Sequence, residues 1–377
     1  MKSIIYIGMD VHKNTYSLCA YDPTTKEYVA ETKCAAEVKM VKKFVESVKK
    51  IYEVGYGEVD IDIKTGYEAG CLGYSLYNQL KKEGIDCDIL APTTMYRSSK
   101  NKVNKNDKLD ARNIATNLAN TTYKAVFVPS DDDVEVKEYI RMTADFKVEL
   151  KKVKQHINAF ILRLGCKYPG KSRWTEAHIK WLTELELSDM QKEIVNEYLA
   201  EYRSLTDKIE RFKERITELS HTEKYEQPVS KLRCFKGIDT DSAMAIHVEI
   251  ADFNRFPNAK AFSSYLGLTP GESSSGESVV YTGITKQGNA MLRSLLVECT
   301  QALVKGNVGK KGKGLKARQK GQEVKVIDYA DKAIERLQRK YHKMIYRGVK
   351  RNKAITAIAR ELACFIWGME TGNIEVY

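Results

Sequence analysis

Apolar and polar residues alternate over the first quarter of the chain in a way that predicts a small mixed α/β layer. Five short segments read as strands, among them the apolar run 4–10 and the alternating segment 15–22, and two segments read as helices, of which 36–48 has the period of an amphipathic helix. The expected strands are 4–10, 15–22, 28–33, 61–68 and 86–90, and the expected helices are 36–48 and 70–82. Three strands, a helix, a strand, a helix and a strand are the order of an RNase H-like (RuvC-like) fold.

Two acidic residues end strands of this expected sheet. Asp10 closes the first strand and Glu68 closes the fourth. In an RNase H-like sheet these two strands are neighbours, so both carboxylates are expected at one edge of the sheet. Taken alone, a strand-terminal aspartate is most often a turn or cap residue.

Two further aspartates stand in the stretch 102–115, KVNKNDKLDARNIA, which has helical spacing. Asp107 and Asp110 are three residues apart, so on a helix both carboxylates point the same way. Two like charges held side by side repel unless a cation lies between them. A divalent metal could supply that cation, and so could the basic residues of the stretch, Lys102, Lys105, Lys108 and Arg112.

The four acids taken together favour the metal. Asp10 and Glu68 arrive from strand ends, and a following helix that carries Asp107 and Asp110 could complete one carboxylate cluster. Crowded carboxylates bind divalent cations, and two such cations can clamp the attacking and leaving oxygens of a phosphodiester. By themselves, Asp107 and Asp110 would usually be a solvated helix face. The joint arrangement predicts metal-dependent chemistry on a phosphodiester.

Beyond Pro129 the pattern changes to seams of apolar residues along two long, charged helices. Each seam alternates steps of three and four residues. The seams are Phe146, Leu150, Val153, Ile157, Phe160 and Leu164, and then Val195, Tyr198, Tyr202, Leu205, Ile209, Phe212, Ile216 and Leu219. A turn-rich break at 165–173 joins them, which predicts an antiparallel hairpin or a coiled-coil arm that pairs with another subunit.

The expected domains follow from these changes of pattern. A RuvC-like domain with the four acids occupies 1–128, the helical arm 129–228, and a mostly helical C-terminal domain 229–377. At the start of the last domain, 231–250 resembles half of a helix-hairpin-helix with Gly237 at its turn, and such turns aim N–H groups at a phosphate. Asp239 stands where a second glycine would be expected, and its charge opposes a phosphate. Phosphate contact and a plain corner between helices both remain open.

A flexible, hydroxyl-rich loop lies within 265–293. Serines 273–275 precede Gly276, and Lys286 then enters a helix that carries Arg293. A serine run before glycine is most often only a loop, and it supplies a nucleophile only if a base or a metal activates it. No histidine is close in sequence, so a Ser-His-Asp hydrolase is not supported. Metals bound by the carboxylates are the remaining source of activation.

Charge points to nucleic acid. The stretch 305–322 holds seven basic and no acidic residues among five glycines, which predicts a loop or disordered insert suited to phosphate contact. A solvated loop is the plainer alternative. The net charge of +12 and the pI near 9.1 favour a polyanionic partner for the whole chain. The final part, 328–369, is expected to form one or two helices with a basic surface.

Other classes of protein are disfavoured. No apolar run approaches the ~18 residues that span a bilayer, and the N-terminal apolar run is too short for a signal peptide. Eight scattered cysteines without a CxxC pair, together with dispersed histidines, argue against a zinc site and a disulfide framework. We expect a cytoplasmic protein without a membrane partner.

With these residues laid out, the chain resembles the DEDD transposases of the insertion-sequence "one-ten" family, the RNA-guided (bridge-RNA) recombinases. The matching pieces span almost the whole chain in the family's order. They are YIGMDVHK (6–13), YEAG (67–70), NKNDKLDAR (104–112), the GID turn and following helix (237–250), GLTPGESSSG (267–276), ITKQGNAMLRSLL (284–296) and RG…KAITAIARELA (347–363). The Lys/Gly-rich stretch 305–322 is longer than the family pattern leads one to expect.

The resemblance implies roles for particular residues. The family's metal-binding acids fall on Asp10, Glu68, Asp107 and Asp110, which would hold Mg²⁺ or Mn²⁺, and its nucleophilic serine falls on Ser275. Ser273 and Ser274 are one or two positions away in the same run, so either could be the counterpart. The residues expected to contact nucleic acid are Lys102, Lys105, Arg112, Gly237, Lys286, Arg293, Lys310, Lys311 and Lys313.

The resemblance also implies a reaction and partners. The serine attacks a DNA phosphodiester and keeps the bond energy in a phosphoserine link, which a free hydroxyl then attacks to exchange strands. Donor and target DNA pair with a structured noncoding guide RNA, so base pairing selects the sequence. Dimers assemble into a tetramer in the bacterial or archaeal cytoplasm, associated with the nucleoid.

Three other functions compete. A RuvC-like, metal-dependent Holliday-junction nuclease would hydrolyse with water and would not need Ser275. A phosphotransferase of the sugar-kinase and actin type also begins with a strand that ends in Asp, but the glycine expected after Asp10 is missing. A nucleic-acid-binding scaffold would use the acids only to pair with Lys and Arg.

Overall fold

The computed structural model describes residues 3–56, 61–96, 106–273 and 280–374. It forms two compact units, Met1–Val128 and Pro129–Tyr377. Four residues singled out above lie outside the described residues: Lys102, Lys105, Ser274 and Ser275.

The first unit is built on a five-stranded sheet in the order β3-β2-β1-β4-β5. The strands are β1 (Ser3–Val11), β2 (Thr15–Asp22), β3 (Glu27–Ala35), β4 (Ile61–Glu68) and β5 (Asp86–Leu90). β1 pairs with β2 and β2 with β3 in antiparallel fashion, while β1–β4 and β4–β5 are parallel. The expected element order is confirmed, and so is the adjacency of the strands that end in Asp10 and Glu68.

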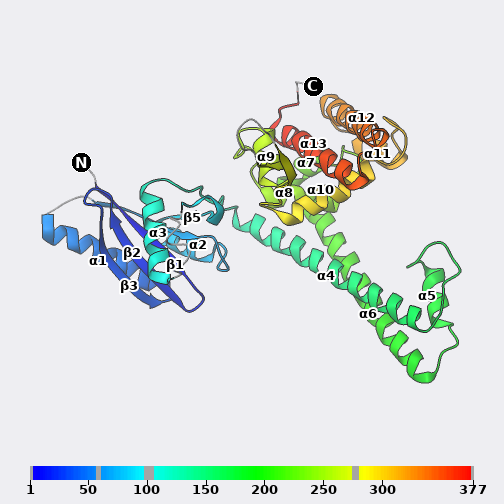
Figure 1. Ribbon diagram of the computed structural model, residues 1–377, viewed down its shortest axis with the longest axis horizontal. Helices are drawn as coiled ribbons and strands as arrows, with labels where there is room; N and C mark the ends of the chain where they lie inside the picture. The colour runs from blue at the N-terminus through cyan, green and yellow to red at the C-terminus, as the bar shows by residue number, and fades with distance from the viewer. Residues whose placement is uncertain (1–2, 57–60, 97–105, 274–279, 375–377) are drawn as a thin grey trace. The chain divides into compact units, whose positions relative to one another are not determined.

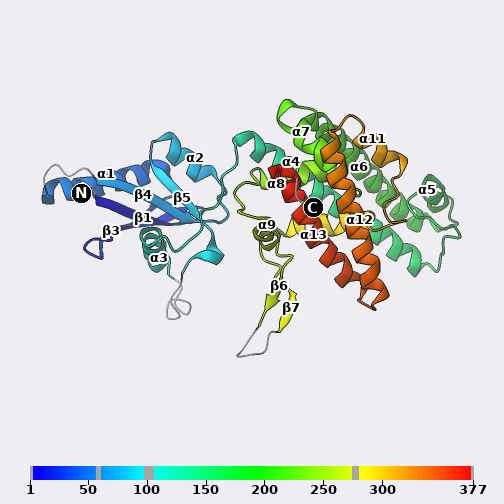
Figure 2. The same cartoon turned by 90° about the horizontal axis from the view of Figure 1, so that it is seen from above.

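Helices cover both faces of this sheet. α1 (Val38–Tyr56) and α2 (Ser75–Lys82) lie on one face, over an apolar core that includes Ile5, Ile7 and Met9, and α3 (Asp107–Ala119) lies on the other (Figure 2). The helix expected at 70–82 begins only at Ser75, because Gly73 adopts a left-handed conformation with φ of 55° that ends the preceding turn. A short 3₁₀ turn, η1 (Pro92–Thr94), follows β5.

Two long helices dominate the start of the second unit (Figure 1). α4 (Asp131–Arg163) and α6 (Asp189–Ser220) pack together, with α5 (Glu176–Thr183) in the connection between them. Phe146 packs on Phe212, and farther along α4 His156 packs on Tyr198, so the two helices run antiparallel. The two helices therefore form the antiparallel hairpin within one chain, which was the first of the two alternatives. Pairing of this arm with another subunit stays a prediction.

The rest of the second unit is a helical body around one apolar core. Its helices are α7 (Glu223–Leu232), α8 (Thr240–Ile250), α9 (Ala259–Tyr265), α10 (Ala290–Leu303), α11 (Lys313–Gln319), α12 (Val324–Tyr346) and α13 (Arg351–Thr371). A short hairpin, β6 (Pro270–Glu272) and β7 (Tyr281–Ile284), projects from it (Figure 2). Where a flexible loop was expected after Pro270, β6 and β7 form a hairpin, and the expected helix with Arg293 is α10. Residues 328–369 form most of two helices.

The basic stretch 305–322 is also corrected, because it contains α11 and is folded onto the body. Gln319 is buried and donates hydrogen bonds to the carbonyl of Cys234 (3.1 Å) and to Asp331 (2.9 Å). Lys311 pairs with Asp331 as well and donates to Gln319 (2.9 Å). The lysine and glycine content alone suggested a solvated loop, but the buried side-chain amide of Gln319 fixes the stretch to the helical body. Among the described helices, none is both long and apolar enough to cross a bilayer.

Candidate active site

Strand register sets a polar row across three strands of the first unit. Asp10 of β1 pairs with Ser17 of β2, and Ser17 pairs with Lys33 of β3. Directly paired residues point to the same face of a sheet. The next pair in β1 and β4 after Met9–Tyr67 would be Asp10 and Glu68, so the alternation places Glu68 on the same face as Asp10.

A glycine lets α3 reach this face closely. A Cβ at Gly8 would lie 2.2 Å from the carbonyl oxygen of Ala111 and 2.3 Å from the amide nitrogen of Ala115. Only glycine fits such an approach of helix backbone to strand backbone. Because Gly8 is two residues before Asp10 on the same face, the contact brings the first turn of α3, which starts at Asp107, toward Asp10.

The result is a small cluster of metal-ligating side chains. His12 Nε2 lies 3.1 Å from Asp10 Oδ2 and 3.7 Å from Asp107 Oδ1. One ligand atom from each of Asp10, His12 and Asp107 lies within 4.8 Å of the other two. Sequence reasoning gave His12 no role, because His12 lies just beyond the end of β1 at Val11 and strand alternation does not place it.

The electrostatics of the cluster show an incompletely balanced negative charge. Burial raises the pKa of Asp10, and the charges of Asp110 and Asp107 raise it further against the opposing effect of His12. Asp107 is more exposed, and the hydrogen bond and charge of Lys33 lower its pKa. The Lys33 Nζ to Asp107 Oδ2 distance is 2.9 Å.

The basic residues expected to neutralise Asp107 and Asp110 are used differently. Lys108 Nζ lies 2.6 Å from Glu31, and Arg112 makes a two-pronged contact with the same carboxylate, one prong at 3.0 Å. These bonds lower the pKa of Glu31 to about 2, with the Arg112 hydrogen bond as the largest cause. Lys102 and Lys105, the other two basic residues expected there, lie outside the described residues. Within the part of the chain that the structure describes, a cation on Asp107 comes from Lys33 of β3, a source that spacing within one helix cannot indicate.

The other two predicted acids lie near the cluster but outside the 4.8 Å group. Asp110 is close enough for its charge to act on Asp10. Glu68 is half-buried at the end of β4 and makes contacts of its own. The structure thus brings Asp10 and Asp107 together, and it places Asp110 and Glu68 on the same side of the sheet.

The donor set fits a hard divalent cation. Mg²⁺ and Mn²⁺ prefer carboxylate oxygens at about 2.1 Å in octahedral geometry, which puts ligand atoms roughly 3–4 Å apart. The distances of His12 Nε2 to Asp10 Oδ2 (3.1 Å) and to Asp107 Oδ1 (3.7 Å) match that span. A cation there would also relieve the mutual repulsion of Asp10, Asp107 and Asp110 that raises the Asp10 pKa.

The first serine of the run, Ser273, directly follows β6 in the hairpin of the second unit. Ser273 is exposed, and its amide donates to the carbonyl of Val280 at 2.8 Å, directly after β6. Pro270 pairs with Ile284 and Glu272 with Tyr281, so the hairpin holds the two ends of the serine loop together. Ser275 itself lies outside the described residues.

The turn at Gly237 joins α7 and α8, and contact of its backbone with a phosphate stays a prediction. Gly237 has φ of 89°, and a Cβ there would lie 2.3 Å from the carbonyl of Cys299, so glycine is needed for packing on α10. Asp239 caps α8, because its side chain accepts from the amide of Ser242 at 2.9 Å. The capping explains the aspartate that looked out of place for a phosphate turn.

Some of the remaining basic residues are bonded within the protein, and others are exposed. Arg293 donates to the carbonyls of Leu266 (3.0 Å) and Gln287 (3.1 Å), which ties α10 to the loop before it. Lys311 is held by Asp331, whereas Lys310, Lys313 and Lys286 are exposed. Contact of these residues with nucleic acid remains a prediction.

A buried network of charged side chains surrounds Glu249 in the second unit, and sequence patterns did not predict it. The Glu249 side chain is 1% exposed and accepts from Arg141 at 2.7 and 3.2 Å and from Asn289 Nδ2 at 2.8 Å, with Lys137 Nζ at 3.5 Å. Asn289 also caps α10. The three partners lie far from Glu249 in sequence, so spacing carries no signal for the network.

Comparison with known proteins identifies the family. A family model for the IS110-type DEDD transposases matches residues 7–165, and one described as "Transposase IS116/IS110/IS902 family" matches residues 229–313. A protein of Sinorhizobium fredii named as a transposase, y4qE, is 33% identical over 304 residues, which cover 80% of this chain and 74% of that protein. The chain belongs to the IS110/IS116 family of DEDD transposases.

Two further relatives of the IS110/IS116 chain are similar along nearly their whole length. The "Transposase for insertion sequence element IS1533" of Leptospira borgpetersenii is 29% identical over 91% of this chain and 97% of its own. The "Transposase for insertion sequence element IS1111A" of Coxiella burnetii is 24% identical over 98% and 91%. The protein is an enzyme that acts on DNA in transposition, and its DEDD domain implies the use of a divalent metal.

Proposed function

We propose that this transposase cleaves and rejoins DNA strands through a covalent serine–DNA link, with divalent metal held by Asp10, Glu68, Asp107 and Asp110. The observation that carries the proposal is the cluster at the β1–α3 contact, where ligand atoms of Asp10, His12 and Asp107 lie within 4.8 Å of one another. Mg²⁺ or Mn²⁺ bound there would polarise the phosphate and stabilise the charge that develops on its oxygens.

The chain's own residues shape this centre. Asp10 and Asp107 provide the carboxylate oxygens, and Gly8 keeps their two elements close enough to share a ligand. His12 orients Asp10 through the 3.1 Å contact. Lys33 balances Asp107 on the opposite side, which leaves one Asp107 oxygen directed toward His12.

Ser275 is the proposed nucleophile. Its hydroxyl oxygen attacks phosphorus, a P–O bond of the strand breaks, and the leaving sugar oxygen takes up a proton. The phosphoserine link keeps the energy of the bond, so a free sugar hydroxyl can later attack it, reform a phosphodiester and release the serine. Water plays no part in either transfer, which separates this reaction from that of a Holliday-junction nuclease.

Guidance by RNA and assembly into dimers and a tetramer complete the proposal. They rest on the resemblance of the seven motifs quoted above, and the net charge of +12 is suited to holding several phosphate backbones. In such a complex the protein reads shape and backbone, and base pairing of a structured noncoding RNA with donor and target DNA selects the sequence.

Covalent trapping tests the nucleophile. A strand-cleavage reaction on labelled DNA is denatured and digested, and the labelled peptide is sequenced; we expect it to contain Ser275. Ser275→Ala should abolish the adduct and recombination, while Ser273→Ala serves as the matched control in the same run. A link to tyrosine would overturn the assignment, and a link to Ser273 or Ser274 would move it within the run. Cleavage that persists in Ser275→Ala without any covalent adduct would favour the water-using nuclease.

Metal titration tests the carboxylates. Calorimetry with Mn²⁺ should show binding by the wild type and none by Asp107→Asn, whose DNA binding should be unchanged. Stability and cleavage that are both independent of divalent metal would contradict the metal-binding role of the carboxylates and would support acids that pair only with Lys and Arg.

A further inference from the structure

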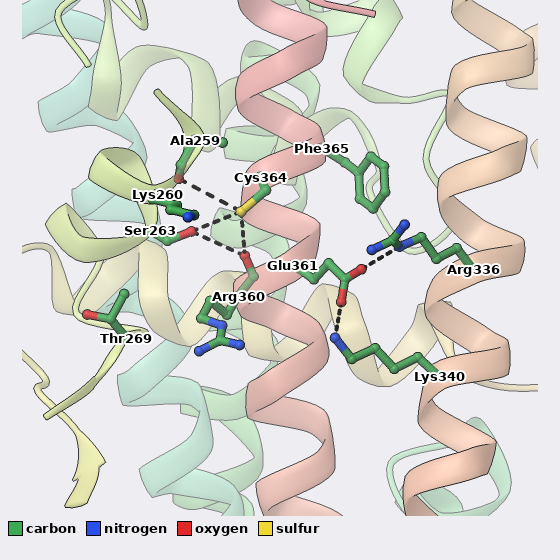
Figure 3. A pocket seen from close by; sticks show the side chains of 10 residues that line it. All are labelled: Ala259, Lys260, Ser263, Thr269, Arg336, Lys340, Arg360, Glu361, Cys364 and Phe365. Carbon is green, nitrogen blue, oxygen red and sulfur yellow. Dashed lines mark hydrogen bonds and ion pairs between the residues drawn. The ribbon is translucent and has the colours of Figure 1, made fainter. Parts of the chain in front are cut away.

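A cavity of about 510 Å³ lies along α13 in the second unit, between α9 and α12 (Figure 3). Pockets that hold small ligands or parts of larger ones typically range from about 300 to 1,000 Å³. Four of its lining residues are basic and one is acidic, and neither the candidate active site nor the resemblance assigns it a role.

The single acid of the cavity is neutralised. Glu361 accepts from Arg336 Nε at 2.6 Å and is bonded also to Lys340, both on α12. Burial raises the pKa of Glu361, but these two cations outweigh it and hold the pKa below its ordinary value. The carboxylate is therefore charged at neutral pH and its charge is matched, so it does not repel an anion from the rest of the cavity.

Two cations on the other side of α13 have no such partner. Figure 3 shows Lys260 and Arg360 on the side that carries Ser263 and Thr269, while Glu361 points away toward α12. Within the described residues, no carboxylate forms an ion pair with Lys260 or Arg360. Ser263 is buried and bonded to the Arg360 carbonyl (3.3 Å) and to Cys364, so it holds α9 against α13 and fixes the backbone beneath both cations.

The cavity adjoins the hairpin that carries the serine loop. Thr269 lines the cavity and directly precedes Pro270, the first residue of β6. Its carbonyl accepts from the amide of Thr285 at 2.9 Å, which ties the cavity wall to the far end of the hairpin. A DNA strand that reaches the serine loop would therefore meet a positively charged recess at the base of that loop.

We propose that this cavity binds one phosphodiester of a DNA strand between Lys260 and Arg360. An Arg guanidinium presents paired N–H donors that match phosphate oxygens, and a Lys ammonium adds a point charge. DNA is the ligand because the wall of the cavity continues into the hairpin of an enzyme that acts on DNA. The inference rests on the proposed function and adds a contact that holds the strand near its serine.

The test is equilibrium binding of fluorescent DNA as a function of salt, in EDTA so that cleavage is not needed. The variants are Lys260→Ala, Arg360→Ala, their combination, and Arg360→Lys. Lys192→Ala and Arg203→Ala are matched controls, because both remove one exposed charge from α6 of the same unit. RNA of the same sequence forms a second arm.

We expect the double variant to bind single-stranded DNA roughly tenfold more weakly than the wild type, since a bond to a charged group is lost. The slope of log affinity against log salt should fall by about 0.7 for a lost phosphate contact. Arg360→Lys should keep the slope, and the controls should keep both affinity and slope. Lys260 is exposed, so Lys260→Ala tests the site even if Arg360→Ala does not fold.

Two outcomes would refute the proposal that this cavity binds a phosphodiester. One is a double variant that behaves like Lys192→Ala combined with Arg203→Ala, and the other is a loss confined to RNA. Wild-type protein that binds no DNA in EDTA would instead refute the proposed function, and the pocket with it.

Discussion

Gly8 of β1 lies directly beneath Ala115 of α3, with the Ala115 amide nitrogen only 2.3 Å from where a Cβ would be. This contact sets the distance between the strand that carries Asp10 and the helix that begins at Asp107. The geometry of the candidate metal centre therefore depends on a residue without a side chain.

Gly8→Ala should damage both fold and metal binding. The new methyl group meets backbone atoms that cannot move aside singly, so α3 has to shift, at a cost of about 1–3 kcal/mol of unfolding free energy. Denaturant unfolding and Mn²⁺ calorimetry would measure the two effects. Gly70→Ala is the control, because its nearest neighbour would be at 3.8 Å and both properties should stay unchanged. Full metal affinity in Gly8→Ala would contradict the positioning role.

Asp10→Asn should stabilise the metal-free protein at neutral pH while abolishing metal binding. The pKa of Asp10 is raised in the fold by burial and by the charges of Asp110 and Asp107, so the unfolded chain releases this proton first as pH rises. Ionisation of Asp10 therefore costs folding free energy. This cost is absent well below pH 3.8, the ordinary pKa of aspartate, and grows as pH rises through that value. Above the pKa of Asp10 in the fold the cost is constant.

Thermal unfolding in EDTA across this range should therefore show the stability gain of Asp10→Asn vanish toward acid. With Mn²⁺ added, only the wild type should gain stability, because binding to the native state shifts the equilibrium. A variant less stable than the wild type at pH 7 in EDTA would refute the electrostatic account.

Lys33→Met should tighten metal binding. Lys33 lies 2.9 Å from Asp107 and competes with any second cation for that carboxylate. Both side chains are more than a third exposed, so the pair is worth only about 0.2–1 kcal/mol, and the Kd for Mn²⁺ should fall about two- to fivefold. Lys43→Met, an exposed lysine on α1, is the control and should leave the Kd unchanged. A weaker Kd in Lys33→Met would indicate that the lysine supports the site.

Glu249→Gln should strongly destabilise the second unit. It removes the counter-charge of the buried Lys137 and the buried carboxylate that Arg141 binds, and breaking such a pair costs about 3–5 kcal/mol. Glu138→Gln is a matched control, because Glu138 contacts the same Arg141 from an exposed position and should cost less than ~1 kcal/mol.

The pH dependence of this network has the opposite sign to that of Asp10. Burial raises the pKa of Glu249, but Arg141, Lys137 and Asn289 outweigh it and lower the pKa below the ordinary 4.5. The stabilisation is thus present above pH 4.5 and is lost as pH falls through the folded pKa. Urea unfolding followed between pH 3 and 7 would check it; a constant difference between wild type and Glu249→Gln would contradict it.

Sequence patterns predicted what depends on local periodicity and on strand order. Asp10 and Glu68 could be placed on neighbouring strands because their strand order is typical of one fold. Lys33 could not be matched to Asp107, because that contact needs the β1–β2–β3 register and the approach at Gly8 together. The network of Glu249 could not be predicted for the same reason, because the residues that pair with this buried carboxylate are distant in sequence and only the fold brings them to it.

The buried Gln319 changes how the basic stretch 305–322 can be used in protein engineering. Its composition suggests a convenient site for an affinity tag, a fluorophore or a shortened version of the chain. The Gln319 amide, however, bridges the carbonyl of the buried Cys234 and the half-buried Asp331, so an insertion or deletion there would leave both groups without this partner. Residues 169–173, which are all exposed in the connection after α4, are the safer place to label this transposase.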